Sequence, residues 1–164
     1  DVWGENPFLV SYEKQASVCF KKLMDFLEDY PDFKVTNSEV RLISERYRYG
    51  GTLDVLGSGR GKKILLDLKR TNGFFPSHRI QVGGGYKTLC DQNAIPIDTV
   101  MLLRCSRDPE AAYQTEILND YNLWYDQFHA LKESYRCERD FIAHRKTPEY
   151  KAQRKLDKTY WKVG

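Results

Sequence analysis

The stretch 63–69 constrains the fold of this chain more than any other segment. Its aliphatic residues are Ile64, Leu65, Leu66 and Leu68. Because successive side chains of a strand point to opposite faces, this run places apolar groups on both faces and predicts a largely buried strand. A second buried strand is predicted over 98–105, which contains Val100, Met101, Leu102 and Leu103. The two runs predict a sheet that is covered on both sides.

The N-terminal part supplies a helix and two further strands. Apolar residues recur at helical spacing over 11–29, and Pro31 follows as a stop signal. Strand patterns cover 33–44, with an irregularity at 36–38, and 47–56. The glycine-rich stretch 57–61 is predicted to be the turn that joins the second of these strands to 63–69, which makes a hairpin.

The C-terminal part alternates between helix and strand. A helix is predicted over 77–92 although it contains three consecutive glycines, which make sense if the helix approaches another surface closely or is kinked there. A further strand is predicted over 113–118. A helix follows from Asn119, with a stripe expected to face the core that consists of Leu123, Trp124, Phe128, Leu131 and Tyr135. The order of elements predicts an α/β fold with a central mixed β-sheet flanked by α-helices.

Length and composition are those of one soluble globular domain. The chain has 164 residues, of which 41% are hydrophobic and 30% charged. We therefore expect 1–164 to form a single domain, with 144–164 as a basic, weakly patterned tail. The lack of an initiator Met is compatible with a domain cut from a longer protein. The four cysteines form no CxxC pair, and no apolar run is long enough to span a membrane, so we expect free thiols and an intracellular location.

Positive charge is concentrated in the middle of the chain. Over 60–90 the only acidic residue is Asp67, whereas the basic residues are Arg60, Lys62, Lys63, Lys69, Arg70, Arg79 and Lys87. A basic strip beside a lone carboxylate suits a polyanionic substrate. The alternative interpretation is a solvated strand edge and loop.

Two acids and a lysine on the predicted hairpin form the constellation with chemical meaning. Asp54 lies near the end of one strand, and Asp67 and Lys69 lie on one face of the next. An unpaired carboxylate inside an apolar strand is costly, and a divalent cation shared by the two acids would compensate it. Oxygen ligands for Mg²⁺ with a nearby lysine suit phosphodiester hydrolysis. A phosphate-loop interpretation of 57–62 is excluded because no Ser or Thr follows Lys62.

The stretch 38–89 resembles the PD-(D/E)XK nuclease superfamily, and within it the RecB-like exonucleases, including phage and CRISPR-associated members. The segments that carry the resemblance are Ser38–Leu42, Tyr49–Gly57, Ile64–Thr71 and His78–Gln81. The resemblance implies a restriction-endonuclease-like core in which Asp54, Asp67 and the backbone carbonyl of Leu68 bind Mg²⁺ or Mn²⁺. The iron–sulfur cysteines of the CRISPR-associated branch have no counterpart here, and no histidine precedes His78.

The same resemblance assigns roles to further residues. Lys69 is similar to the catalytic lysine, Glu39 to the upstream glutamate that helps to bind the metal, and Gln81 to the helix glutamine that orients the substrate or the lysine. Glu45 is the competing upstream acid. Relatives commonly have an aromatic residue four positions after the glutamine, but here Tyr86 lies five positions on, roughly 140° around an α-helix, and matches only if the glycines distort the helix.

The function expected from these features is that of a Mg²⁺-dependent deoxyribonuclease, first an exonuclease, acting on single- or double-stranded DNA. The alternatives are an endonuclease of the same fold, of the restriction or junction-resolving type, and a non-catalytic nucleic-acid-binding or assembly module. The residues expected to contact DNA are Arg60, Lys62, Lys63, Arg70, Phe74, Phe75 and Arg79. Each of these basic residues could instead be merely solvated, and the two phenylalanines could instead pack into the core. Homo-oligomers, or other domains of a longer protein, are compatible with each of these functions.

Overall fold

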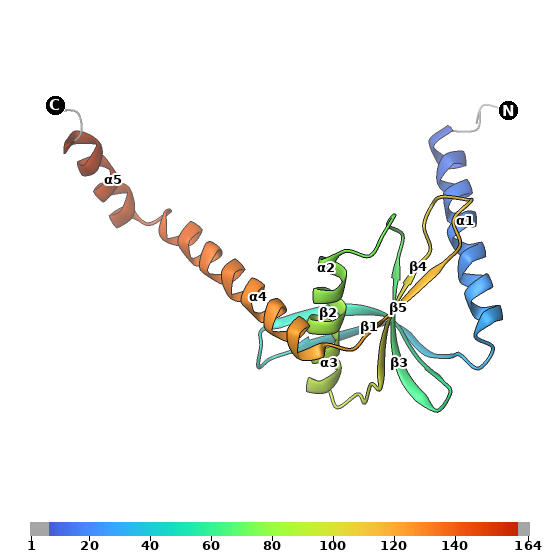
Figure 1. Ribbon diagram of the computed structural model, residues 1–164. Helices are drawn as coiled ribbons and strands as arrows, with labels where there is room; N and C mark the ends of the chain where they lie inside the picture. Colours follow the sequence, from blue (N-terminus) through green and yellow to red (C-terminus); the bar gives the residue numbers. More distant parts are fainter. Residues whose placement is uncertain (1–6, 161–164) are drawn as a thin grey trace.

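A five-stranded sheet forms the centre of the computed structural model, which describes the backbone of residues 7–160 and the side chains of residues 12–155 (Figure 1). In spatial order the strands are β1 (Lys34–Ser44), β2 (Tyr49–Gly59), β3 (Lys62–Lys69), β4 (Thr99–Arg104) and β5 (Gln114–Leu118). Strands β3 and β4 are parallel, and the other neighbouring pairs are antiparallel. The predicted α/β fold with a mixed sheet flanked by helices is therefore confirmed.

Helices lie on both sides of this sheet. One side carries α1 (Pro7–Asp29), and the other carries the crossover between the parallel strands (Figure 1). That crossover is one continuous helical stretch made of α2 (Pro76–Arg79), the π-helix η1 (Ile80–Tyr86) and α3 (Lys87–Gln92). After β5 the chain forms α4 (Tyr121–His144) and α5 (Pro148–Tyr160). None of the described helices combines the length and the apolar character needed to cross a membrane.

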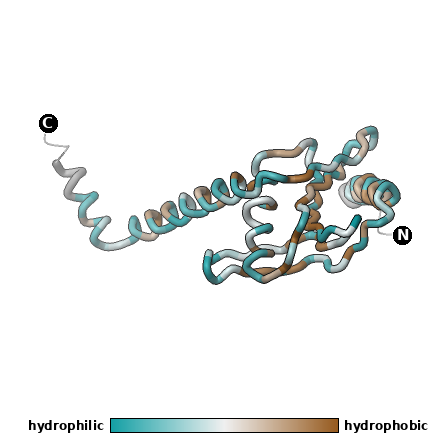
Figure 2. The backbone as a smooth tube through the Cα atoms, turned by 60° about the horizontal axis from the view of Figure 1, so that its bottom comes forward, coloured by the Kyte–Doolittle hydropathy of each residue, from teal (hydrophilic) through white to brown (hydrophobic). Residues whose placement is uncertain are grey.

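The apolar residues form two clusters, one on each face of the sheet. Phe26 of α1 packs with Ile64 and Leu66 of β3, whereas Leu65 packs with Val82 of η1. Alternation along β3 thus divides its side chains between the two clusters, as predicted for a strand buried on both faces. The most hydrophobic backbone segments accordingly lie in the sheet, while α4 and α5 are largely hydrophilic (Figure 2).

The β2–β3 hairpin differs from the prediction in the length of its turn. Strand β2 continues to Gly59, so that the turn consists of Arg60 and Gly61 alone, which have φ values of +51° and +74°. Two residues of positive φ match the right-handed twist of the flanking strands. Gly57 lies within the strand, where a Cβ atom would come 2.7 Å from the ring of Phe33. This glycine permits close packing and makes no turn.

The irregularity expected at 36–38 is confirmed. The β1–β2 register shifts between Val35 and Asn37. A second irregularity follows at Glu39, whose φ is +53°, a conformation that non-glycine residues adopt rarely. It lies between Ser38 and Val40, which pair with Val55 and Leu53, and therefore lies across from Asp54.

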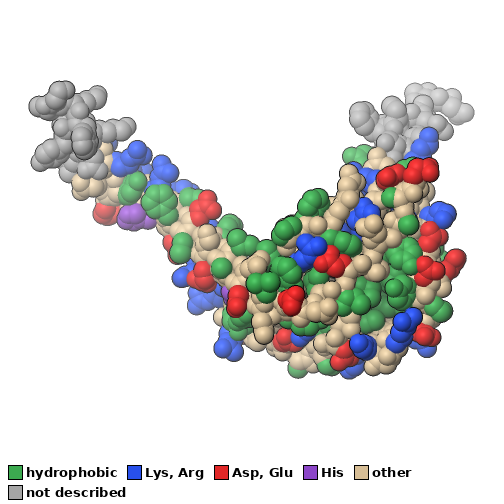
Figure 3. Space-filling view, in the orientation of Figure 1, with side chains coloured by type: hydrophobic (Ala, Val, Ile, Leu, Met, Phe, Trp, Pro, Cys, Tyr) green, Lys and Arg blue, Asp and Glu red, His purple; other side chains and the backbone are tan. Residues whose placement is uncertain are grey.

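Helix α4 corrects the prediction of a core-facing stripe along its whole length. Its first turns pack on η1 through Trp124 and Phe128. Farther along, Leu131 and Tyr135 are 58% and 62% exposed, because the helix outruns the crossover and projects from the body of the protein (Figure 1). The segment expected to be a weakly patterned tail contains α5. Lys and Arg side chains line this projecting part (Figure 3).

Candidate active site

The two aspartates lie where β2 and β3 diverge. Val55 and Leu66 form the last pair of the β2–β3 ladder, so that the next residues, Asp54 and Asp67, lie across from each other. Beyond this point the N–H of Leu68 donates to Oδ2 of Asp54 at 2.8 Å, in place of a bond to the β2 backbone. The end of the ladder therefore leaves room for side-chain oxygens between the strands.

Asp67 is a buried carboxylate whose charge is only partly compensated. The residue is 2% exposed, and Nζ of Lys69 lies 2.6 Å from Oδ2. Among the described residues, however, Oδ2 accepts no hydrogen bond of good geometry. Burial raises the pKa of Asp67 to about 6, with Asp54 adding to the rise and Lys69 opposing it. The carboxylate thus lies in a position where a further positive charge would stabilise it.

A chain of hydrogen bonds connects Lys69 to the crossover helix. Nζ of Lys69 donates to Oε1 of Gln81 at 3.0 Å, and Nε2 of Gln81 donates to the hydroxyl of Tyr86 at 2.9 Å. Burial raises the pKa of Tyr86, and Asp67 and Asp54 raise it further, so that its hydroxyl stays protonated at neutral pH. The structure therefore brings Gln81 next to the lysine, the neighbour that the resemblance implied.

Tyr86 joins this chain because the helix is a π-helix at that point. The cap of η1 shows the i to i+5 bonding, with the N–H of Lys87 donating to the carbonyl of Val82. In this wider helix, residues five apart lie on nearly the same face. Gln81 and Tyr86 therefore face the same way, whereas in an α-helix they would point in different directions around the axis. The aromatic residue left doubtful by helical spacing thus belongs to the site.

The three glycines of η1 allow its close packing against α4. A Cβ atom on Gly84 would lie 2.2 Å from the backbone oxygen of Trp124, and one on Gly85 would lie 2.8 Å from the ring of Phe128. Of the two predicted reasons for the glycines, the close approach to another surface is therefore confirmed. Gly51 of β2 has a related role, since a Cβ there would lie 2.8 Å from the Tyr86 ring.

The upstream acids are less closely associated with the site. Glu39 lies across from Asp54 but is exposed, and within the described residues no group of three His, Cys, Asp or Glu side chains converges to hold a metal ion. Glu45 lies in the exposed β1–β2 turn. The structure therefore brings two carboxylates together, and Glu39 remains a neighbour on the adjacent strand.

The groups around Asp67 suit a hard divalent cation. Oδ2 of Asp67, whose single close partner among the described residues is the ammonium group of Lys69, and the carboxylate of Asp54 are oxygen donors of the kind that Mg²⁺ prefers. The N–H and C=O groups of one strand residue point to the same side, so the carbonyl of Leu68 faces β2, as its N–H does. Two carboxylates and one carbonyl are therefore available to bind such an ion.

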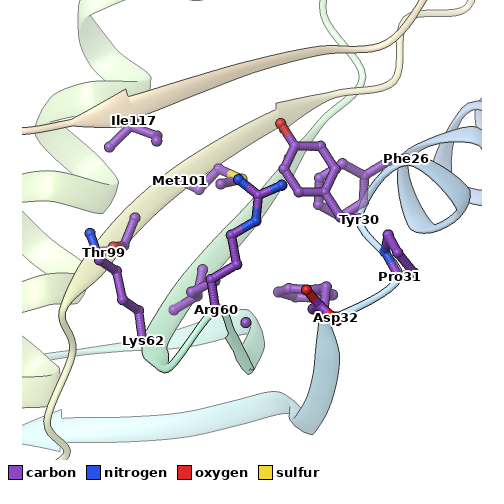
Figure 4. A pocket seen from close by; sticks show the side chains of 12 residues that line it. Phe26, Tyr30, Pro31, Asp32, Arg60, Lys62, Thr99, Met101 and Ile117 are labelled. Atoms are coloured by element: carbon purple, nitrogen blue, oxygen red, sulfur yellow. The ribbon is translucent and has the colours of Figure 1, made fainter.

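The basic residues of the middle region are separated from one another. Lys62 and Lys63 lie at the opposite end of β3 from the site, and Lys63 is about 13 Å along the strand from Asp67. Arg60 is beside them, 5.8 Å above the ring of Tyr30, and lines with Lys62 an apolar pocket of about 210 Å³ (Figure 4). These three cations lie far from the aspartates.

Two other predicted DNA contacts lie closer. Arg70 is exposed directly after Lys69. Arg79 forms a bidentate ion pair with Glu116 of β5, with N–O distances of 2.6 and 2.9 Å, which neutralises its charge. Arg70 thus keeps its charge available beside the site, whereas that of Arg79 is neutralised.

The two phenylalanines after β3 have different environments. Phe74 packs against the core cluster that contains Leu65. Phe75 is 48% exposed at the start of α2, and its ring contacts that of His78 at a centroid distance of 5.3 Å. Of these two rings, that of Phe75 is therefore the more exposed to solvent.

Arg104 is a site residue that the sequence analysis missed. Its Cα pairs with that of Lys69 across the parallel ladder, and it is 7% exposed. One guanidinium nitrogen donates to the carbonyl of Asn72 at 2.9 Å, while Nε has no hydrogen-bond partner among the described residues. A charged residue at the end of a buried strand was the available signal. Arg104 thus adds a buried cation on the strand next to Lys69.

Comparisons of the chain with protein-family models and with curated proteins gave no match.

Proposed function

We propose that this chain is a Mg²⁺-dependent DNA phosphodiesterase of the PD-(D/E)XK type that acts as an exonuclease. The observation that carries the proposal is the buried Oδ2 of Asp67, which lacks a hydrogen bond, lies 2.6 Å from Nζ of Lys69 and faces a second aspartate. A purely structural ion pair would not need a second carboxylate beside it, which raises the pKa of the first.

The metal ligands in this proposal are the carboxylates of Asp54 and Asp67 and the carbonyl of Leu68, with Glu39 as a further oxygen donor on the neighbouring strand. A bound Mg²⁺ supplies Lewis acidity, which polarises the phosphate and lowers the pKa of a water molecule. The carboxylates supply the negative charge that holds such an ion. The hydrogen bond from Leu68 keeps Asp54 oriented toward the gap between the strands.

Lys69 supplies positive charge beside the reacting phosphate. Its ammonium group is held between Oδ2 of Asp67 and Oε1 of Gln81, and Gln81 is held in turn by the hydroxyl of Tyr86. A positioned cation stabilises the charge that develops in the transition state without having to reorganise. The guanidinium of Arg104, on the strand next to Lys69, adds positive charge behind the lysine.

The test is cleavage of linear and covalently closed circular DNA, single- and double-stranded, in Mg²⁺, Mn²⁺ or EDTA. The wild type is compared with Asp67→Asn and Lys69→Met. Asp25→Asn is the matched control, because Asp25 is also paired with a lysine, at 3.1 Å, but lies on α1. We expect metal-dependent loss of the linear substrates, a decrease of at least 100-fold in both site variants, and full activity in the control.

Each other outcome has a distinct meaning. Cleavage of closed circles would replace the exonuclease with an endonuclease of the same chemistry. Undiminished cleavage by Asp67→Asn would exclude the proposed site. Absence of cleavage of every substrate, with DNA binding unchanged in the site variants, would support the non-catalytic binding module.

A further inference from the structure

A second basic feature lies away from the two aspartates. The β1–β2 turn and α4 enclose a groove of about 640 Å³. Its basic side chains are Arg46, Arg48, Lys132, Arg136 and Arg139. This groove was not anticipated from the sequence, because its two walls are more than 80 residues apart.

The groove is held in place by aromatic packing. Tyr47 of the turn has its ring 4.6 Å from that of His129, and its hydroxyl accepts a hydrogen bond from Tyr125 at 3.1 Å. Lys132 donates to the carbonyl of Tyr47 at 2.9 Å. These contacts attach the turn to α4, so that the cations on the two walls keep a defined spacing.

The groove carries more positive charge than its own acids neutralise. Glu133 pairs with both Arg136, at 2.7 Å, and Lys132, at 3.3 Å. Asp140 is the second acid that lines the groove. Within the described residues, the remaining cations form no ion pair with a carboxylate; they are Arg46, Arg48 and Arg139. Three such guanidinium groups around one hollow suit a ligand with several anionic groups in a row.

The groove and the aspartates lie along one strand. Arg48 immediately precedes β2, and Asp54 lies six residues farther on, a distance of about 20 Å along an extended strand. Both lie on the side of the sheet that η1 and α4 cover, because α4 forms one wall of the groove and packs on η1, and Lys69 beside the aspartates bonds to Gln81 of η1. In B-form DNA about six phosphates of one strand span this distance, at about 3.4 Å each.

We propose that this groove binds the sugar–phosphate backbone of DNA about six nucleotides from the bond that the aspartate site cleaves. The identification of the substrate rests on the proposed function. The groove contacts phosphates, because guanidinium groups on exposed side chains donate hydrogen bonds to phosphate oxygens and fix the position of the backbone. It determines how long a substrate must be for tight binding.

The experiment measures binding of a fluorescein-labelled 20-nucleotide DNA, single-stranded and duplex, by anisotropy in EDTA. The variant Arg48→Gln/Arg139→Gln is compared with Lys14→Gln/Lys34→Gln, which removes two exposed cations from α1 and from the far end of β1. Loss of two phosphate contacts at 0.1 M salt predicts a Kd about 25-fold higher for single strands and about 60-fold higher for duplex. The slope of log Kd against log salt decreases by about 1.4 to 1.8. The control binds like the wild type.

A variant that is expected to increase DNA affinity excludes misfolding as the cause of weaker binding. Glu133→Gln releases the two cations that this acid neutralises, and we expect it to bind DNA several-fold more tightly than the wild type. Equal binding by the groove variant and the α1/β1 control would overturn the proposal. So would a Glu133→Gln variant that binds more weakly.

Cleavage in Mg²⁺ separates this proposal from the proposed function. With a 20-nucleotide substrate the groove variant is expected to raise KM and keep kcat, whereas a four-nucleotide substrate is too short to reach the groove and shows no difference. If the wild type cleaves no DNA but the groove variant loses binding in EDTA, the groove stands and the nuclease function fails. If the wild type cleaves DNA and the groove variant binds normally, the groove fails alone.

Discussion

Replacing Asp67 with asparagine is expected to stabilise the metal-free protein while abolishing its response to Mg²⁺. Burial raises the pKa of Asp67 from its ordinary value of 3.8 to about 6. At about 1.4 kcal/mol per pKa unit, the buried charge costs about 3 kcal/mol, an upper value because the surroundings relax. Asparagine has nearly the same shape and no charge, so it removes this penalty.

The direction of the pH dependence follows from the raised pKa. The folded protein holds the proton of Asp67 more tightly than the unfolded chain does, so this group favours folding below pH 4. That contribution is lost as the pH rises through about 6. The stabilisation of Asp67→Asn relative to the wild type is therefore expected to be about 1.5 kcal/mol at pH 5. It approaches about 3 kcal/mol at pH 8, equivalent to about 6–12 °C in Tm.

Thermal and urea unfolding at pH 5 and pH 8 in EDTA measure this difference. Repeating the pH 8 series in 10 mM Mg²⁺ should raise the stability of the wild type and leave Asp67→Asn unchanged, because only the wild type has both carboxylates. Asp25→Asn, on the exposed face of α1, should change stability by less than about 0.5 kcal/mol at either pH. A metal-free Asp67→Asn protein that is less stable than the wild type at pH 8 would refute the reasoning.

Three further variants test the surroundings of the site. Gly84→Ala places a Cβ atom 2.2 Å from the Trp124 carbonyl oxygen and should lower the unfolding free energy by about 3 kcal/mol or more in a urea titration. Gly73 has open space around it, so Gly73→Ala should change the unfolding free energy by less than about 0.5 kcal/mol in the same titration. Tyr86→Phe removes one hydrogen bond of the glutamine–lysine chain, so kcat should fall about two- to twelvefold while Tm stays within a few degrees. Arg104→Gln should lower kcat/KM by about 10- to 100-fold, and wild-type kinetics in this variant would remove it from the site.

The spacing of an α-helix failed to predict which residues share a face at η1, where the helix is a π-helix. The spacing of Gln81 and Tyr86 argued against a shared face, yet the i to i+5 bonding of η1 brings the two side chains to 2.9 Å. The three glycines were the only indication of this. Their role became clear only from the position of α4. The backbone of Trp124 lies so close to η1 that a side chain on Gly84 would collide with it.

The apolar stripe of α4 shows a different limit of sequence reasoning. A helical pattern of Leu and aromatic residues indicates a face to be buried, but it does not say how far the partner surface extends. Trp124 meets η1, and Tyr135, three turns later, meets solvent. The basic residues over 60–90 show the same limit. They are close in the sequence, but the length of β3 separates those at its start from those at its end.

The sequence by itself determined the layered α/β fold and the pair of aspartates with Lys69, because alternation and hairpin register are local properties of neighbouring segments. Only the tertiary structure decided which other side chains join them. Tyr86 and Arg104 reach the site from the crossover helix and from β4, whereas Lys62 and Lys63 are carried away from it along β3. The physical reason is that the crossover and the parallel pairing bring together residues whose distance along the chain holds no information about their distance in space.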